Sequence, residues 1–149
     1  TASLIANSSK AIGVLSDVDQ NSLNSLYSFG RQLGLAFQVV DDILDFTGND
    51  EQLGKPAASD LQSGYLTAPV FFALEENPTL SELINGKFSK KDDLEKALFI
   101  VRDSGAIQKS RELAEKFASE ARDSICWLPD SPSKKALLEL PEFVISRLY

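Results

Sequence analysis

The sequence predicts an all-α protein, and three observations support this class. Apolar residues recur at helical spacing along most of the chain, and no segment alternates apolar and polar residues as a strand does. Short polar, glycine or proline breaks separate these segments. Apolar residues make up 43% of the composition, yet no apolar run reaches the ~18 residues of a membrane-spanning helix. We therefore expect packed helices around a buried core.

Three helices are predicted in the first half of the chain. Apolar residues at near-helical spacing indicate the first helix, and a polar stretch from Ser16 to Gln20 follows it. The second helix carries an apolar stripe and breaks at a Thr-Gly-Asn-Asp sequence. Asp60 is expected to cap the third. The predicted bounds are Ala2–Leu15, Ser22–Phe46 and Leu61–Glu76.

Turn residues divide the second half into four further helices. Thr79 and Glu82 form a capping box for a short helix that ends at Asn85. Ser89 is predicted to cap the next helix, and Pro141 is expected to kink or split the last one. The predicted bounds of the last three helices are Lys90–Ser104, Ala106–Trp127 and Pro132–Leu148.

Charge and composition exclude several classes of function. The chain has 15 basic and 22 acidic residues, and a net charge of −7 argues against binding nucleic acid or an anionic membrane. It has no histidine, which excludes a Ser-His or Cys-His nucleophile and histidine metal ligands. Cys126 is the only cysteine, so an internal disulfide is impossible, and we expect a buried thiol.

Three aspartates, Asp41, Asp42 and Asp45, lie in the last turns of the second predicted helix. A helix end carries unpaired carbonyl groups and partial negative charge, so anionic side chains are disfavoured there. Their spacing also places the carboxylates on one helical face, where they repel one another. A divalent cation would stabilise this arrangement, because a hard cation such as Mg²⁺ prefers carboxylate oxygens that converge from one side.

Gln38 lies one helical turn before the first two aspartates, so an amide and the three carboxylates share a stripe. Mg²⁺ usually takes few protein carboxylates and completes its shell with water and substrate phosphates. The pattern therefore predicts a metal-bridged polyphosphate ligand, and a solvated acidic helix end remains the alternative. A calcium loop is excluded, because its sixth position would be Asp50 instead of glycine and its twelfth Pro56 instead of glutamate.

A lysine follows the aspartates within the sequence Leu53-Gly54-Lys55-Pro56. Gly54 allows a tight turn, and Pro56 restricts the residue before it. Lys55 in such a turn would neutralise phosphate oxygens as a point charge. An ordinary surface lysine is the other interpretation of this residue.

One block of the sequence resembles the second aspartate-rich region of trans-polyprenyl diphosphate synthases. The matching residues are Gly34, Phe37, Gln38, Asp41, Asp42 and Asp45, followed by Gly54-Lys55-Pro56, Asp60-Leu61, Gly64, Thr67 and Pro69. The resemblance extends over residues 1–149 and is nearest to the long-chain, solanesyl diphosphate synthase type. It implies the all-α isoprenoid synthase fold. It also implies prenyl chain elongation, in which isopentenyl diphosphate attacks the allylic cation left when diphosphate departs.

The resemblance also implies roles for individual residues. Asp41, Asp42 and Asp45 would hold Mg²⁺ against the diphosphate of the allylic substrate. Lys55 would contact the same diphosphate and, with Asp41 and Asp42, form the catalytic set. Gln38 would help to orient the substrate. Thr1 matches the threonine of the family's Lys-Thr pair, which binds the allylic diphosphate through a lysine expected one position before it.

The family's first aspartate-rich motif and its arginine cluster for isopentenyl diphosphate have no counterpart in this sequence. We therefore expect residues 1–149 to be the C-terminal part of a single polyprenyl synthase domain, inactive by itself. The resemblance implies a homodimer in a plastid or the cytoplasm. Two other classes stay open: a noncatalytic regulatory subunit of the same fold, and an unrelated helical interaction module with a solvated acidic helix end.

Overall fold

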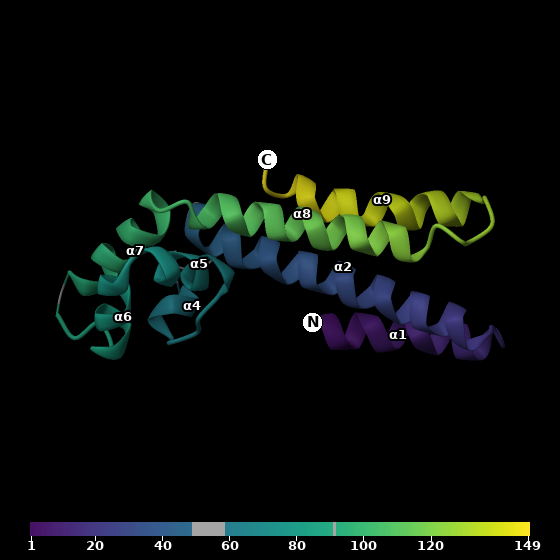
Figure 1. Cartoon of the computed structure of the whole chain (residues 1–149), viewed down its shortest axis with the longest axis horizontal. Helices are drawn as coiled ribbons and strands as arrows, with labels where there is room; N and C mark the ends of the chain where they lie inside the picture. The colour runs from purple at the N-terminus through teal and green to yellow at the C-terminus, as the bar shows by residue number, and fades with distance from the viewer. Residues whose placement is uncertain (49–58, 91) are drawn as a thin grey trace. The chain divides into compact units, whose positions relative to one another are not determined.

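A computed structural model describes residues 1–48, 59–90 and 92–149 of the chain (Figure 1). Within these ranges every regular element is a helix and no strand occurs, which confirms the all-α class. The helices are α1 (Ala2–Leu15), α2 (Gln20–Thr47), α4 (Ser59–Gln62), α5 (Ala68–Glu76), α6 (Pro78–Asn85), α7 (Asp93–Asp103), α8 (Ala106–Ser124) and α9 (Pro132–Ser146). They form two compact units, residues 1–40 with 113–149 and residues 41–112.

The first unit begins with the close pairing of α1 and α2. A Cβ atom added at Gly30 would lie 2.6 Å from the carbonyl oxygen of Ile5, and one added at Gly34 would lie 2.5 Å from the Cα atom of Ala2. Both distances are far shorter than a van der Waals contact. The missing side chains therefore allow the two helix backbones to approach each other.

Helices α8 and α9 complete the first unit as an antiparallel hairpin (Figure 1). The amide of Gln32 in α2 donates to a carboxylate oxygen of Glu120 at 2.6 Å, and the hydroxyl of Ser124 donates to that of Ser28 at 3.1 Å. Small side chains let α8 pack closely within the unit. In this unit, the buried residues of α8 and of the turn after it are Ala114, Ala118, Ala121 and Ile125.

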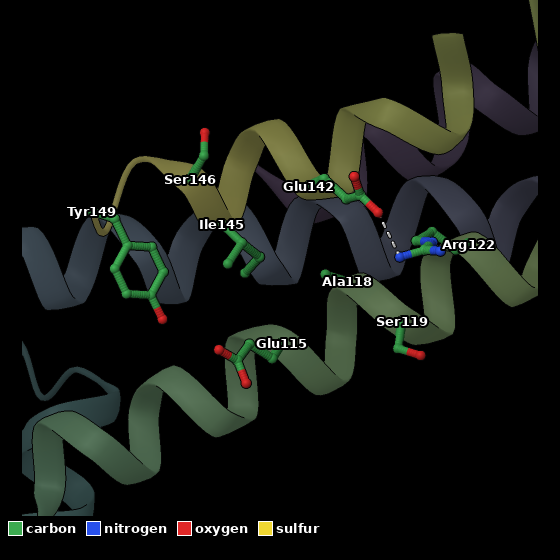
Figure 2. A pocket seen from close by; sticks show the side chains of 8 residues that line it. All are labelled: Glu115, Ala118, Ser119, Arg122, Glu142, Ile145, Ser146 and Tyr149. Carbon is green, nitrogen blue, oxygen red and sulfur yellow. Dashed lines mark hydrogen bonds and ion pairs between the residues drawn. The ribbon is translucent and has the colours of Figure 1, made fainter. Parts of the chain in front are cut away.

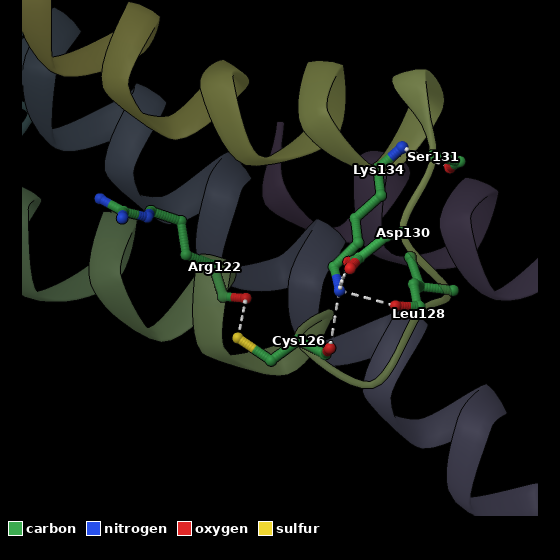
Figure 3. A network of polar contacts seen from close by, with 6 residues as sticks. All are labelled: Arg122, Cys126, Leu128, Asp130, Ser131 and Lys134. Carbon is green, nitrogen blue, oxygen red and sulfur yellow. Dashed lines mark hydrogen bonds and ion pairs between the residues drawn. The ribbon is translucent and has the colours of Figure 1, made fainter.

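Lys134 closes the turn between α8 and α9 (Figure 3). Its ammonium group donates to the backbone oxygens of Cys126 and Leu128, at 3.0 and 2.7 Å, and to the carboxylate of Asp130 at 3.0 Å. The carbonyl groups at and just beyond a helix end lack intrahelical partners, and a cation there supplies donors and offsets the partial negative charge. One side chain thus fixes the path between the two helices.

The second unit contains the end of α2, helices α4 to α7 and the start of α8. Its core is made of fully buried apolar residues from these helices: Phe46, Leu61, Val70, Ala73, Leu80, Ala97, Val101 and Ala106. Lys109 also pairs with Glu76 in this unit. Their hydrogen bond and opposite charges lower the pKa of Glu76 and raise the pKa of Lys109.

The prediction of one helix over Leu61–Glu76 was wrong, because this segment contains the end of α4 and the whole of α5. Gly64 has φ of +85°, a left-handed conformation that ends a helix. Pro69 stands in the first turn of α5, where its missing N–H leaves no hydrogen bond unmade. Asp60 lies in the first turn of α4, so its prediction as the cap was also wrong.

Two further caps differ from the predicted ones. The side chain of Asn77 caps α6 by accepting from the Thr79 amide, so the predicted capping box does not begin this helix. Helix α7 begins at Asp93 and not at Lys90. The Asp93 carboxylate accepts from the Lys90 amide at 2.9 Å and satisfies that donor ahead of the helix.

The end of α8 and the continuity of α9 differ from what the sequence predicted. Helix α8 ends at Ser124, which leaves Cys126 exposed in the following turn instead of buried. Helix α9 continues through Pro141, so the predicted split is wrong, while the predicted kink stays a prediction. Proline removes a helical hydrogen bond, and the burial of Pro141 and Val144 offsets that loss.

Candidate functional site

The three aspartates lie at the C-terminal end of α2, as predicted. Asp41 is partly buried, Asp42 is 8% exposed and Asp45 is 1% exposed. A solvated acidic helix end would leave all three carboxylates in water, and the burial of Asp42 and Asp45 argues against that interpretation. A buried carboxylate requires hydrogen-bond donors or a cation close to it.

Protein donors hold two of the carboxylates. Asp45 accepts from the hydroxyl of Ser59 at 3.3 Å and from the amide of Asp60 at 3.4 Å, both in the first turn of α4. Asp42 accepts from the amide of Ala68, the first residue of α5, at 3.3 Å. The first amides of a helix lack intrahelical acceptors and carry partial positive charge. The end of α2 is therefore joined to the starts of α4 and α5 by its own carboxylates.

The carboxylates also fit a hard cation of the Mg²⁺ type. Among residues 1–48, 59–90 and 92–149, no group of three or more acidic, cysteine or histidine side chains is arranged to hold a metal by itself. Mg²⁺ needs few protein carboxylates, because water and phosphate oxygens complete its shell. The hydroxyl oxygen of Thr67, next to Ala68, is buried and lacks a hydrogen-bond partner in the part of the chain that the structure describes. A metal-bound water or a phosphate oxygen would satisfy such an atom.

Thr1 and Gln38, predicted to bind substrate, contact each other in the first unit. The Thr1 hydroxyl donates to the side-chain oxygen of Gln38 at 3.1 Å. The close approach at Gly34, one turn before Gln38, brings Ala2 and hence Thr1 to this helix. The contact orients the Gln38 amide, which lies on the same continuous helix as the aspartates.

Lys55 belongs to residues 49–58, outside the described residues, so its predicted role stays a prediction. Arg147 is exposed just beyond the end of α9. Its guanidinium carbon also lies 4.7 Å from the centroid of the Phe37 ring, a cation–π contact that the sequence did not reveal.

A pocket of about 390 Å³ lies elsewhere, between α8 and α9 (Figure 2). The ion pair of Arg122 and Glu142, 2.8 Å apart, lies toward one end, and Tyr149 lies toward the other. None of the residues predicted from the sequence lines this pocket. The acidic end of α2 therefore remains the candidate site.

Sequence reasoning missed the donors that hold the aspartates. Ser59 could have been found, because serine commonly begins a helix and accepts or donates there. The role of the Ala68 amide could not be predicted from the sequence, because every residue except proline carries a backbone N–H donor. Tertiary packing alone identifies which amide meets Asp42.

Comparison with known proteins relates the whole chain to one family. The polyprenyl synthetase family model matches residues 1–101. A prenyl transferase of Cyanophora paradoxa is 54% identical over the whole chain, which covers 46% of that protein. The chloroplastic solanesyl diphosphate synthase 2 of Arabidopsis thaliana is 48% identical over 99% of the chain and 36% of its own length. The chain thus spans about half the length, or less, of these relatives.

Solved structures share the fold. A medium/long-chain length prenyl pyrophosphate synthase of Arabidopsis, in its apo form, superposes with a TM-score of 0.88 at 41% identity, over all of this chain and 52% of that one. Heptaprenyl diphosphate synthase of Staphylococcus aureus gives a TM-score of 0.90 at 32% identity, over 98% of this chain and 46% of that one. Together with the match over residues 1–101, these likenesses confirm the resemblance and the isoprenoid synthase fold. The chain belongs to the polyprenyl synthetase family.

Proposed function

We propose that this chain supplies the second aspartate-rich part of the active site in an enzyme that lengthens prenyl diphosphates. The substrates would be an allylic diphosphate and isopentenyl diphosphate, and the product a longer all-trans polyprenyl diphosphate. One observation carries the proposal: Asp42 and Asp45 are buried at a helix end and held by the starts of two other helices, in a member of the polyprenyl synthetase family.

Asp41, Asp42 and Asp45 would hold Mg²⁺. Bound there, the metal would neutralise the diphosphate leaving group and so favour its departure. The amides of Asp60 and Ala68 hold two of the carboxylates before any ligand arrives, so little reorganisation is needed on binding. Asp41, the most exposed of the three, is the carboxylate most open to a metal with its own water and phosphate ligands.

Two further groups would act on the substrate. The Gln38 amide, oriented by Thr1, would help to place the allylic diphosphate. Lys55 would neutralise phosphate oxygens that the metal leaves uncovered. In this proposal no protein nucleophile takes part. The double bond of isopentenyl diphosphate attacks the allylic cation, and the new carbocation loses a proton to restore a double bond.

Calorimetric titration with a non-hydrolysable allylic diphosphate analogue tests the proposal. We expect the chain to bind the analogue in the presence of Mg²⁺ and more weakly without it. Asp41→Asn keeps the side-chain size and removes the charge, and should weaken the Mg²⁺-dependent binding by about tenfold or more. Asp103→Asn, which neutralises an exposed aspartate at the end of α7, is the matched control and should bind as the unchanged chain does.

A folded chain with no Mg²⁺-dependent binding would instead favour a noncatalytic subunit of the same fold. The solanesyl diphosphate synthase 2 of Arabidopsis thaliana and a similar synthase of Oryza sativa subsp. japonica are chloroplastic, which favours a plastid location over the cytoplasm for this protein. No helix among the described residues is long and apolar enough to cross a membrane.

Two experiments test the location and the assembly. Import of the full-length protein into isolated chloroplasts would test the plastid location, and light scattering would test the expected homodimer.

A further inference from the structure

The last turn of α2 concentrates negative charge. It carries Asp45 and follows Asp41 and Asp42, and the helix has no basic residue in that turn. The carbonyl groups of a final turn add partial negative charge of their own. Some donor from another element must therefore hold this turn in place before a metal arrives.

Arg102, in the last turn of α7, contacts this end of α2. Its Nε–H group donates to the carbonyl oxygen of Phe46 at 2.9 Å. Val101 and Phe46 are both fully buried in one core, so core packing fixes the register that brings Arg102 to the turn. Arg102 also lines a pocket of about 440 Å³ at this end of α2. The other residues that line it are Phe46, Thr47, Gly48 and Ile107.

We propose that Arg102 is a positioning residue for the metal-binding carboxylates. It holds the carbonyl of the residue next to Asp45, while Ser59 and the Asp60 amide hold the Asp45 carboxylate itself. In this turn, α7 therefore holds the backbone at Phe46, and α4 holds the side chain of Asp45. The inference rests on the proposed function, because it concerns how these carboxylates receive Mg²⁺.

Arg102 has two opposite effects on Mg²⁺ binding, and this makes the inference testable. Its positive charge repels the metal, so removing the charge alone would tighten binding. Its hydrogen bond orders the turn, so losing the bond would weaken binding. Arg102 is exposed, and water and salt screen an exposed charge. The orienting effect should therefore dominate.

The test is a titration of the 149-residue chain with Mg²⁺ alone, followed through the NMR signals of the aspartate carboxylate carbons. Arg102→Met keeps the aliphatic stem and removes the donor, and should weaken Mg²⁺ binding by about tenfold. Arg102→Lys should recover part of the loss, because an ammonium group can also donate to the Phe46 carbonyl. Lys109→Met, which removes the ion pair with Glu76 in the same unit, is the control and should leave Mg²⁺ binding unchanged.

The outcomes separate the possible roles. Circular dichroism and thermal unfolding first establish that each variant is folded. Unchanged or tighter Mg²⁺ binding by Arg102→Met overturns the inference while leaving the proposed metal site intact. Binding by Arg102→Lys as weak as that of Arg102→Met overturns it as well, since the donated hydrogen bond would then not be the cause. Absence of Mg²⁺ binding in the unchanged chain overturns both the metal site and this inference.

Discussion

Gly34 determines how closely α1 approaches α2, and through that approach the contact between Thr1 and Gln38. An added Cβ atom would lie 2.5 Å from the Cα atom of Ala2, which is backbone and cannot rotate away. Gly34→Ala should therefore push α1 outward and destabilise the chain by about 1–3 kcal/mol. Urea denaturation measures this loss.

Gly105, which has no backbone neighbour close to an added Cβ atom, provides the control. At Gly105 the nearest atom to an added Cβ is a Glu76 carboxylate oxygen 4.0 Å away, at the end of a flexible side chain. Gly105→Ala should leave stability nearly unchanged or raise it slightly, because alanine has less freedom in the unfolded chain. Equal stability losses in both variants would show that the close approach of α1 is not what Gly34 provides.

The α8–α9 hairpin depends on Lys134 at its turn (Figure 3). The lysine side chain is only 15% exposed, and its ammonium donates three hydrogen bonds within the turn. Lys134→Met keeps most of the volume but leaves two backbone oxygens without that donor. We expect a loss of about 1–3 kcal/mol, again measured by urea denaturation.

Lys135, the next residue, gives a matched control for the hairpin. Its side chain is 81% exposed, and the distance between its charged group and that of Glu139 is 3.9 Å. Surface pairs of this kind contribute little, so Lys135→Met should change stability by less than about 0.5 kcal/mol. A loss as large as that of Lys134→Met would mean that charge in general, and not the bonds in the turn, stabilises the hairpin.

At the scale of the whole molecule, we predict that the 149-residue chain alone does not elongate prenyl chains. It carries one aspartate-rich DDxxD motif and spans about half the length of its prenyl transferase relatives. Positioning both substrates requires groups from all sides of a closed site. Incorporation of labelled isopentenyl diphosphate into longer products measures this activity.

The full-length relative from Synechocystis, 52% identical over this chain, serves as the positive control in the same assay. Product formed by the 149-residue chain at a rate near that of the control would contradict the prediction. Such a result would also mean that these residues supply both substrate sites.

Much of the fold and part of the site could be predicted from the sequence. The helix α1 has the predicted bounds, and Gly105 separates α7 from α8 as expected, because helical periodicity and helix-ending residues are local signals. The break between α4 and α5 was missed, although Gly64 and Pro69 are both visible in the sequence. Neither residue by itself reports that Gly64 adopts a positive φ angle.

The sequence by itself determined the class of the fold and the family resemblance, and it singled out Asp41, Asp42 and Asp45 as the candidate site residues. These depend on residue type and spacing, which folding does not change. The tertiary structure alone decided that Asp42 and Asp45 are buried, and that the donors holding this helix end are Ser59, Asp60, Ala68 and Arg102. Burial and backbone donors depend on contacts between residues far apart in the chain, and no local pattern encodes them.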